Sequence, residues 1–108
     1  MGTDDGAPRK GDVLCPGADL CGVDLSFAYL PRVDLRGAAL NGADLSYSCL
    51  IGATLVEADL TDVNLFGANL AEADLRGANL TGADTRYVNF YKTKLGGNKT
   101  DRNNIPNT

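Results

Sequence analysis

Leucine recurs at every fifth position along most of this chain, and the residues around it follow the same step. From Ala18 to Gly97 the sequence divides into sixteen five-residue units without an insertion. We number the positions of each unit from 1 to 5, starting with Ala18 at position 1. Position 1 is Ala in ten units, position 2 is Asp or Asn in eleven, position 3 is Leu from Leu20 to Leu80, and position 5 is Gly in eight. The pattern of apolar positions 1 and 3 around a polar position 2 therefore predicts one element repeated many times.

A five-residue step fits neither a helix nor an ordinary strand. On an α-helix of about 3.6 residues per turn, successive leucines would be about 140° apart and would scatter over every side. In a strand the side chains alternate with a period of two, so an odd repeat would place successive leucines on opposite faces. The chain must therefore turn inside each unit, with positions 1 and 3 pointing inward. Repeated many times, this predicts a solenoid.

The unit resembles the motif of the pentapeptide-repeat family, which is Ala or Ser, then Asp or Asn, then Leu or Phe, then two variable residues. The resemblance implies an all-β fold, a right-handed quadrilateral β-helix with four units per coil, and residues 18–97 would form about four coils. Residues 1–17 would be a flexible N-terminal tail or cap, in which Val13–Cys15 falls in register as a degenerate repeat. Residues 98–108 would be a polar C-terminal tail.

With four units per coil, every twentieth residue stacks on the same side of the core. At position 2, Asp and Asn are expected to accept hydrogen bonds from N–H groups of the adjacent turn, which is a structural role. The predicted core consists of the apolar position-3 side chains: Leu20, Leu25, Leu30, Leu35, Leu40, Leu45, Leu50, Leu55, Leu60, Leu65, Leu70, Leu75, Leu80, Phe90 and Leu95.

Composition argues against an enzyme. The chain has no His and no Trp, which removes the usual general base and the commonest metal ligand. The sequence contains no phosphate-binding loop and no set of metal ligands at a recognisable spacing. We therefore expect no catalytic residue, no cofactor and no metal site. The net charge of −4 gives no cationic field for nucleic acid or an anionic membrane, so neither is expected as a partner.

The three cysteines, Cys15, Cys21 and Cys49, form no C-x-x-C pair, and an odd number suits a reducing compartment. Cys21 and Cys49 would lie on opposite sides of the solenoid, too far apart for a disulfide. No apolar segment has the length of a signal peptide or of a membrane span. The sequence therefore predicts a soluble, cytoplasmic protein.

The aromatic residues are segregated in the predicted solenoid. Of the seven Phe and Tyr residues, only Phe90 falls on an inward position, and the others crowd one edge while the opposite edge is charged. We name this predicted surface the aromatic edge; its members are Phe27, Tyr29, Tyr47, Ile51, Phe66, Tyr87 and Tyr91. Exposed apolar patches mark interaction sites, but stacked rings can also simply stabilise neighbouring coils. Both interpretations stay open at this stage.

Two functions from different classes follow. The first is a non-catalytic structural and protein–protein interaction module that binds an unidentified protein through the aromatic edge and forms homo-oligomers through exposed coil ends or that edge. The second is implied by the resemblance: a DNA mimic that binds DNA gyrase, as a topoisomerase inhibitor or protection factor. Charge is also uneven along the chain, because residues 1–84 have 13 acids and 5 bases whereas residues 85–108 have one acid and five bases. The solenoid should therefore be dipolar along its axis.

Overall fold

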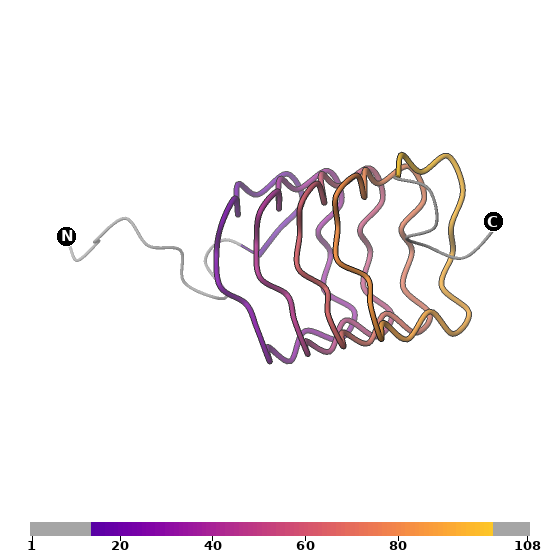
Figure 1. Cartoon of the computed structure of the whole chain (residues 1–108). Coiled ribbons are helices and arrows are strands. Elements are labelled where there is room, and N and C mark those ends of the chain that lie inside the picture. Colours follow the sequence, from indigo (N-terminus) through magenta and orange to yellow (C-terminus); the bar gives the residue numbers. More distant parts are fainter. Residues whose placement is uncertain (1–13, 101–108) are drawn as a thin grey trace.

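The computed structural model describes residues 14–100, which form a single stack of turns (Figure 1). This part of the chain contains no helix, and no strand in it is longer than a single bridge position. Instead, thirteen isolated parallel bridges each join a residue to the one twenty positions later, from Asp19↔Ala39 to Asn79↔Lys99. One turn of the chain therefore takes twenty residues, which is four of the five-residue units.

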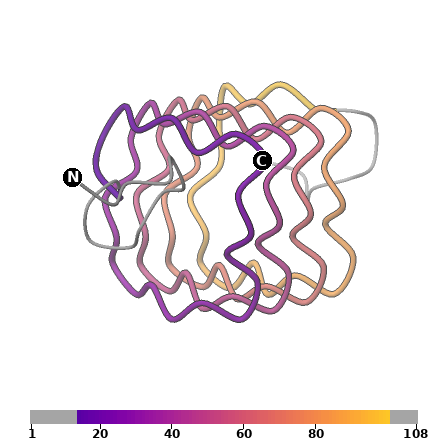
Figure 2. The ribbon, with the colours of Figure 1, turned by 90° about the vertical axis from the view of Figure 1, so that its left-hand side faces the viewer.

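Each unit is a short extended piece followed by a tight bend. The N–H of position 1 donates to the C=O of position 3 in the preceding unit, as from Ala43 to Leu40 at 2.9 Å, and closes the bend. The extended piece pairs with both neighbouring turns: the Asp44 N–H donates to the Val23 C=O at 2.9 Å, and the Leu25 N–H donates to the Asp44 C=O at 2.8 Å. Figure 2 shows the turns as loops lying one behind another.

Position 5 has a left-handed backbone throughout, whether or not it is glycine. From Gly17 to Gly97, φ at this position lies between +54° and +76°. A positive φ at the second central residue is the requirement of a type II turn, which explains the frequent glycines. Side chains at this φ carry strain of about 1–2 kcal/mol each. Eight position-5 residues accept that strain: Phe27, Arg32, Tyr47, Glu57, Asp62, Glu72, Tyr87 and Lys92.

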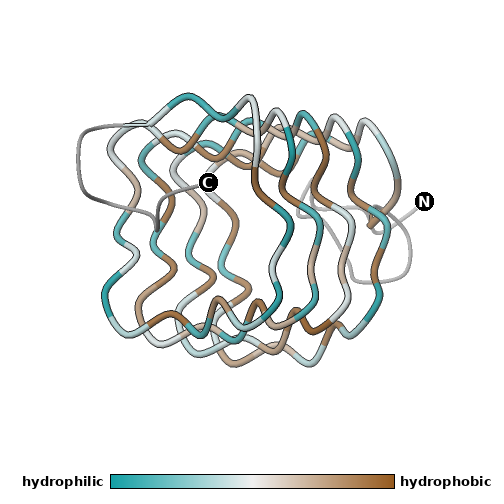
Figure 3. Cartoon of the chain, turned by 90° about the vertical axis from the view of Figure 1, so that its right-hand side faces the viewer, coloured by the Kyte–Doolittle hydropathy of each residue, from teal (hydrophilic) through white to brown (hydrophobic). Residues whose placement is uncertain are grey.

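Positions 1 and 3 fill the interior. All position-3 leucines from Leu20 to Leu80 are buried, and those from Leu35 to Leu80 are 0% exposed. Alanines at position 1 pack between them, and the one buried serine at that position, Ser48, donates its hydroxyl to the Leu45 C=O at 2.7 Å. Figure 3 shows hydrophobic and hydrophilic residues alternating along the turns, as this inward–outward pattern requires.

The last described turn is more open than the sequence predicts. Phe90 and Leu95 pack against the core as expected, but both are only half-buried, and so is Thr85 at the equivalent position. Position-3 side chains of earlier turns are covered by the turn that follows them. Within residues 14–100, no such turn follows Phe90 and Leu95, so their burial is incomplete.

The regular hydrogen bonds extend beyond residues 18–97 at both ends. The Ala18 N–H donates to the Cys15 C=O at 3.1 Å, so the bend before Ala18 is built like the later ones. At the other end Lys99 pairs with Asn79, and Asn98 donates its side-chain amide to the Leu75 C=O at 2.5 Å. Val13 and the remaining residues of the two predicted tails, 1–13 and 101–108, lie outside the described residues.

Candidate interaction surface

Four aromatic rings form a continuous contact chain along one corner of the solenoid. The rings of Phe27 and Tyr47 are stacked, with centroids 5.0 Å apart and planes at 13°. Phe66 then meets Tyr47 edge-on at 5.7 Å and Tyr87 edge-on at 5.2 Å. We name these four residues the aromatic column. Ring pairs of this kind add about 0.5–1.5 kcal/mol each beyond the area they bury, so the column ties together four successive turns.

Gly67 explains why the third ring of the column comes from a different position. Phe27, Tyr47 and Tyr87 occupy position 5, whereas the third turn has Gly67 there and Phe66 at position 4. A Cβ atom at Gly67 would stand 2.7 Å from Cε1 of Tyr47, closer than atoms approach. The Tyr47 ring therefore lies over Gly67, and Phe66 reaches it from the side.

The predicted aromatic edge divides into the column and a neighbouring group. Tyr29, Ile51 and Tyr91 stand on the next side of the solenoid, and Tyr29 and Tyr91 are 77% and 61% exposed. Within residues 14–100, neither of these tyrosines makes a ring–ring contact. Ile51 is half-buried, as is Phe66. The structure thus brings four of the seven residues into contact and leaves three beside them.

The side that carries Tyr29, Ile51 and Tyr91 is the one side without charge at its outward positions 2 and 4 in residues 18–100. Each of the other three sides has at least three charged residues at these positions. Depletion of charge is typical of the centre of a protein interface. We name this surface the uncharged side; its outward residues are Tyr29, Pro31, Cys49, Ile51, Asn69, Ala71, Asn89 and Tyr91.

The side chains of position 2 are turned toward their own bends, which confirms the structural role predicted for them. In all eleven units with Asp or Asn at this position, Oδ1 accepts the N–H of position 4 at 2.9–3.3 Å. This N–H is the one backbone donor that the bends and the bridges leave over. Pro31, which has no N–H, stands in the unit whose position 2 is Tyr29.

Three arginines form two-point ion pairs that the sequence analysis missed. In each pair Nε donates to Oδ1 at 2.9 Å and Nη2 donates to Oδ2 at 2.6–2.8 Å: Arg36 with Asp34, Arg76 with Asp74, and Arg86 with Asp84. These hydrogen bonds hold the pKa of each aspartate below its ordinary value. The signal was present as Asp-x-Arg, because positions 2 and 4 both point outward.

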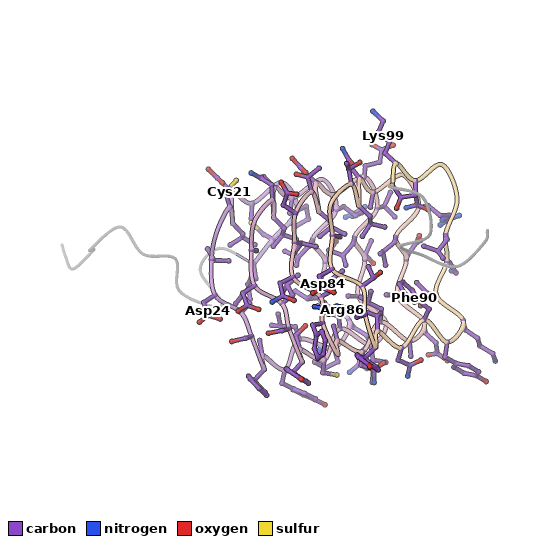
Figure 4. The ribbon with its side chains drawn as sticks, viewed as in Figure 1. Cys21, Asp24, Asp84, Arg86, Phe90 and Lys99 are labelled. Atoms are coloured by element: carbon purple, nitrogen blue, oxygen red, sulfur yellow. The ribbon has the colours of Figure 1, made fainter. Side chains whose placement is uncertain are left out.

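Arg86 also joins the ion pairs to the aromatic column. Its guanidinium lies over the Phe66 ring, 5.0 Å from the centroid, in a cation–π contact. Figure 4 shows Asp84 and Arg86 together on one face of the solenoid, with Asp24 on the same face at the N-terminal end. The Phe66 ring is therefore held by a cation–π contact as well as by its contacts with two other rings.

The cysteines and acids within residues 14–100 are considered next. All three cysteines are free, and Asp19 raises the pKa of the exposed Cys21 thiol by hydrogen bonding, which disfavours its reactive thiolate. In the described part of the chain, no three His, Cys, Asp or Glu side chains are grouped to hold a metal ion. The same residues include no helix long and apolar enough to cross a membrane.

Comparison with known proteins assigns the family. A family model for pentapeptide repeats matches residues 18–55 and 58–97 in eight copies. The chain belongs to the pentapeptide-repeat family. This confirms the resemblance inferred from the sequence, and the fold is the right-handed β-helix that structures of such proteins imply. No curated protein matches the sequence closely enough to count as a relative.

Several solved pentapeptide-repeat proteins are similar to this one. A protein from Nostoc PCC 7120 is 31% identical with a TM-score of 0.71, over 77% of this chain and 84% of that chain. Rfr23 from the cyanobacterium Cyanothece 51142 is 41% identical, with a TM-score of 0.53 over 80% and 62% of the two chains. A protein of the Arabidopsis thaliana thylakoid lumen is 35% identical, with a TM-score of 0.57 over 92% and 64%. The chain spans less than two thirds of the length of the latter two.

Proposed function

We propose that this pentapeptide-repeat protein is a non-catalytic interaction module that binds a protein partner through the aromatic edge. The proposal takes the fold to be a quadrilateral solenoid of about four turns and the location to be cytoplasmic. The observation that carries it is the pairing of the aromatic column with the adjoining uncharged side. Together they form a surface rich in aromatic side chains along the solenoid, whereas the other three sides carry charge at their outward positions 2 and 4. Arg32, Glu72 and Lys92 border this surface at the next corner.

Packing between turns does not account for all of this surface. Ring contacts explain Tyr47 and Phe66, each of which touches a ring on both sides. They do not explain Tyr29 and Tyr91, which lie outside the column and are largely exposed. The Tyr91 ring instead contacts the Lys92 ammonium, which lies 5.4 Å from its centroid. Large exposed aromatic side chains on a side whose outward positions 2 and 4 have no charge are typical of residues that anchor a partner.

The test compares two pairs of tyrosine and phenylalanine substitutions. Proteins captured from a native lysate by the wild-type chain are identified and purified, and each is titrated against the variants. We expect Tyr29→Ser with Tyr91→Ser to weaken binding by about tenfold or more, with an unchanged melting temperature. Tyr47→Ser with Phe66→Ser should lower both affinity and melting temperature, because it also breaks the column.

The matched control removes exposed side chains from the charged corners. Glu57→Ser with Asp62→Ser changes two exposed position-5 residues away from the aromatic edge and should leave binding intact. If the Tyr29 and Tyr91 variant binds every captured protein as tightly as the wild type, the aromatic edge is not the binding surface.

The DNA-mimic function is a second proposal. In its favour, Asp24 and Asp44 stand at position 2 of one side on bridged turns about 4.8 Å apart, and Asp84 follows two turns beyond Asp44, after Asn64. Against it, Arg86 neutralises Asp84 in a two-point pair. A DNA gyrase supercoiling assay with added protein distinguishes the functions: inhibition or protection supports mimicry, and no effect at high protein concentration excludes it.

A further inference from the structure

Three backbone donors in the second turn of the solenoid have no acceptor inside the protein. At position 4 the N–H is normally met by an Asp or Asn side chain at position 2, but three units of this turn have another residue there. Within residues 14–100, the N–H groups that make no hydrogen bond for this reason belong to Asn41, Ile51 and Val56. All three residues are half-buried, so an acceptor supplied from outside would remove the cost of an unmade hydrogen bond.

The Ile51 N–H has an unpaired cation beside it. Arg32 stands on the turn before, and its backbone N–H donates to the Ile51 C=O at 2.8 Å. Its side chain extends over the turn that contains Ile51, because Cγ of Arg32 lies 3.1 Å from the place where a Cβ would stand on Gly52. Three other arginines of the solenoid form two-point ion pairs, whereas the Arg32 guanidinium forms none within residues 14–100.

These two donors lie in the middle of the stack, where the uncharged side meets its corner. Cys49, which takes the place of the capping Asp or Asn in this unit, is bridged to Tyr29 on one side and to Asn69 on the other. The Asn69 Oδ1 already accepts the Ala71 N–H at 3.0 Å, so it is engaged in its own bend. The surface around Ile51 therefore offers hydrogen-bond donors and no carboxylate at its outward positions 2 and 4.

We propose that the uncharged side binds a carboxylate side chain of its protein partner, which accepts hydrogen bonds from the Ile51 N–H and the Arg32 guanidinium. This inference rests on the proposed function and names the chemistry of the partner. Hydrogen bonds between ionised groups are shorter and stronger than neutral ones, so a carboxylate is the acceptor that fits an unpaired guanidinium beside an N–H.

The carboxylate belongs to an Asp or Glu inside an extended segment rather than to a chain terminus. Tyr29 lies in the first turn and Tyr91 in the fourth, so the two exposed rings stand on both sides of Ile51 along the solenoid. A segment that contacts both rings must continue past the carboxylate in both directions. A chain terminus would end at the site and reach one ring.

The first test uses peptides, because the partner is not needed for it. Random linear peptides in a display library are selected on the immobilised full chain, and selection should enrich an Asp or Glu with apolar neighbours. One selected peptide is synthesised with its acid and again with the corresponding amide. Fluorescence polarisation should show that the amide peptide binds about tenfold more weakly. Arg32→Gln should weaken binding of the acidic peptide by about the same factor and leave the amide peptide unaffected.

Two substitutions address the N–H itself. Ile51→Pro removes the donor, and the bend accepts proline there because Pro31 occupies position 4 one turn earlier. It should bind the acidic peptide about fivefold more weakly than Ile51→Ala, which loses the side chain but keeps the N–H. Cys49→Asn supplies an internal acceptor like those of the other units. It should raise the melting temperature and weaken binding by about fivefold.

The matched control is Thr54→Asn. It supplies the same acceptor to the Val56 N–H, which lies on a charged side, so it should raise the melting temperature and leave peptide binding unchanged. Selected peptides without an acid, equal affinity for the acid and amide peptides, or a Cys49→Asn variant that melts higher but binds like the wild type would overturn the proposal. Those results would leave the proposed function standing if Tyr29→Ser with Tyr91→Ser still weakens binding of captured proteins.

Discussion

The third turn of the solenoid and its last described turn have the same sequence pattern but different interiors. Leu60, Leu65 and Leu70 are 0% exposed, whereas Phe90 and Leu95 are half-buried. The residue types do not cause this difference, because Phe and Leu are as apolar as the residues they follow. It arises because contacts in a solenoid run mainly between adjacent turns. The position of a residue in the stack, rather than its place in the repeat, therefore sets its contribution to stability.

The largest expected effect is the loss of stability when a leucine of the third turn, rather than one of the last described turn, is replaced by alanine. Leu60→Ala should lower the free energy of unfolding by about 2–5 kcal/mol, because it leaves a cavity between two complete turns. Leu95→Ala should cost about 1–2 kcal/mol, since part of that side chain is already in water. Urea denaturation followed by circular dichroism measures both. Equal losses would contradict the dependence on position in the stack.

A second comparison uses glycines with the same φ. Gly22 and Gly67 have φ of +70° and +71°, but a Cβ at Gly22 meets open space and one at Gly67 meets the Tyr47 ring. Gly22→Ala should cost about 1 kcal/mol through backbone strain alone. Gly67→Ala should cost about 2 kcal/mol, because the Tyr47 ring must also move. Thermal melts of the two variants that coincide would show that the ring does not depend on Gly67.

Two asparagines of the uncharged side allow a matched comparison with a smaller expected loss of stability. Asn69 and Asn89 each accept the N–H of position 4, from Ala71 at 3.0 Å and from Tyr91 at 2.9 Å. Asn69 is half-buried and Asn89 is exposed. Asn69→Ala should therefore cost about 1–2 kcal/mol. For Asn89→Ala we expect about 0.5 kcal/mol, because water can replace the lost acceptor. A larger loss at Asn89, measured by urea denaturation, would reverse the comparison.

The smallest expected effect is on the loss of folding stability at acid pH. The Arg76 hydrogen bond lowers the pKa of Asp74 below its ordinary 3.8, and Arg36 acts in the same way on Asp34 in the first turn. A lowered pKa in the folded state adds stability that is complete above the ordinary pKa and lost as the pH falls through the lowered value. Arg76→Gln should reduce the dependence of stability on acid pH more than Arg36→Gln does. The reason is that the Asp74 side chain is 17% exposed, whereas that of Asp34 is 44% exposed. Urea unfolding midpoints of the wild type and both variants, taken between pH 5 and pH 2 in steps of about one pH unit, measure this dependence.

Much of the fold follows from the sequence because one register repeats. The Leu at position 3 and the Asp or Asn at position 2 each have one structural task, so their placement could be predicted. The left-handed backbone of Tyr47 and Glu57 could not, because neither residue favours a positive φ. The bend imposes that conformation, and the hydrogen bonds of the neighbouring turns hold it. The hydrogen bonds between turns thus outweigh the preference of a single residue for a negative φ.

The candidate surface was predictable in its members but not in its contacts. The spacing of twenty residues per turn places Phe27, Tyr47 and Tyr87 at the same corner, and it predicts a gap at Gly67, which has no side chain. The structure adds that the Tyr47 ring covers this gap and that Phe66 links Tyr47 to Tyr87.

The bridges between residues twenty apart also limit how such a chain can change length. Removing residues 48–67 would take out one full turn, and every remaining column would keep its register, with Tyr47 followed directly by Ala68. Removing only residues 58–62 would rotate everything after them by a quarter turn. Tyr87 would then leave the corner that holds Phe27 and Tyr47. We therefore expect natural insertions and deletions to come in steps of twenty residues wherever a surface must survive, and engineered versions to tolerate the same steps.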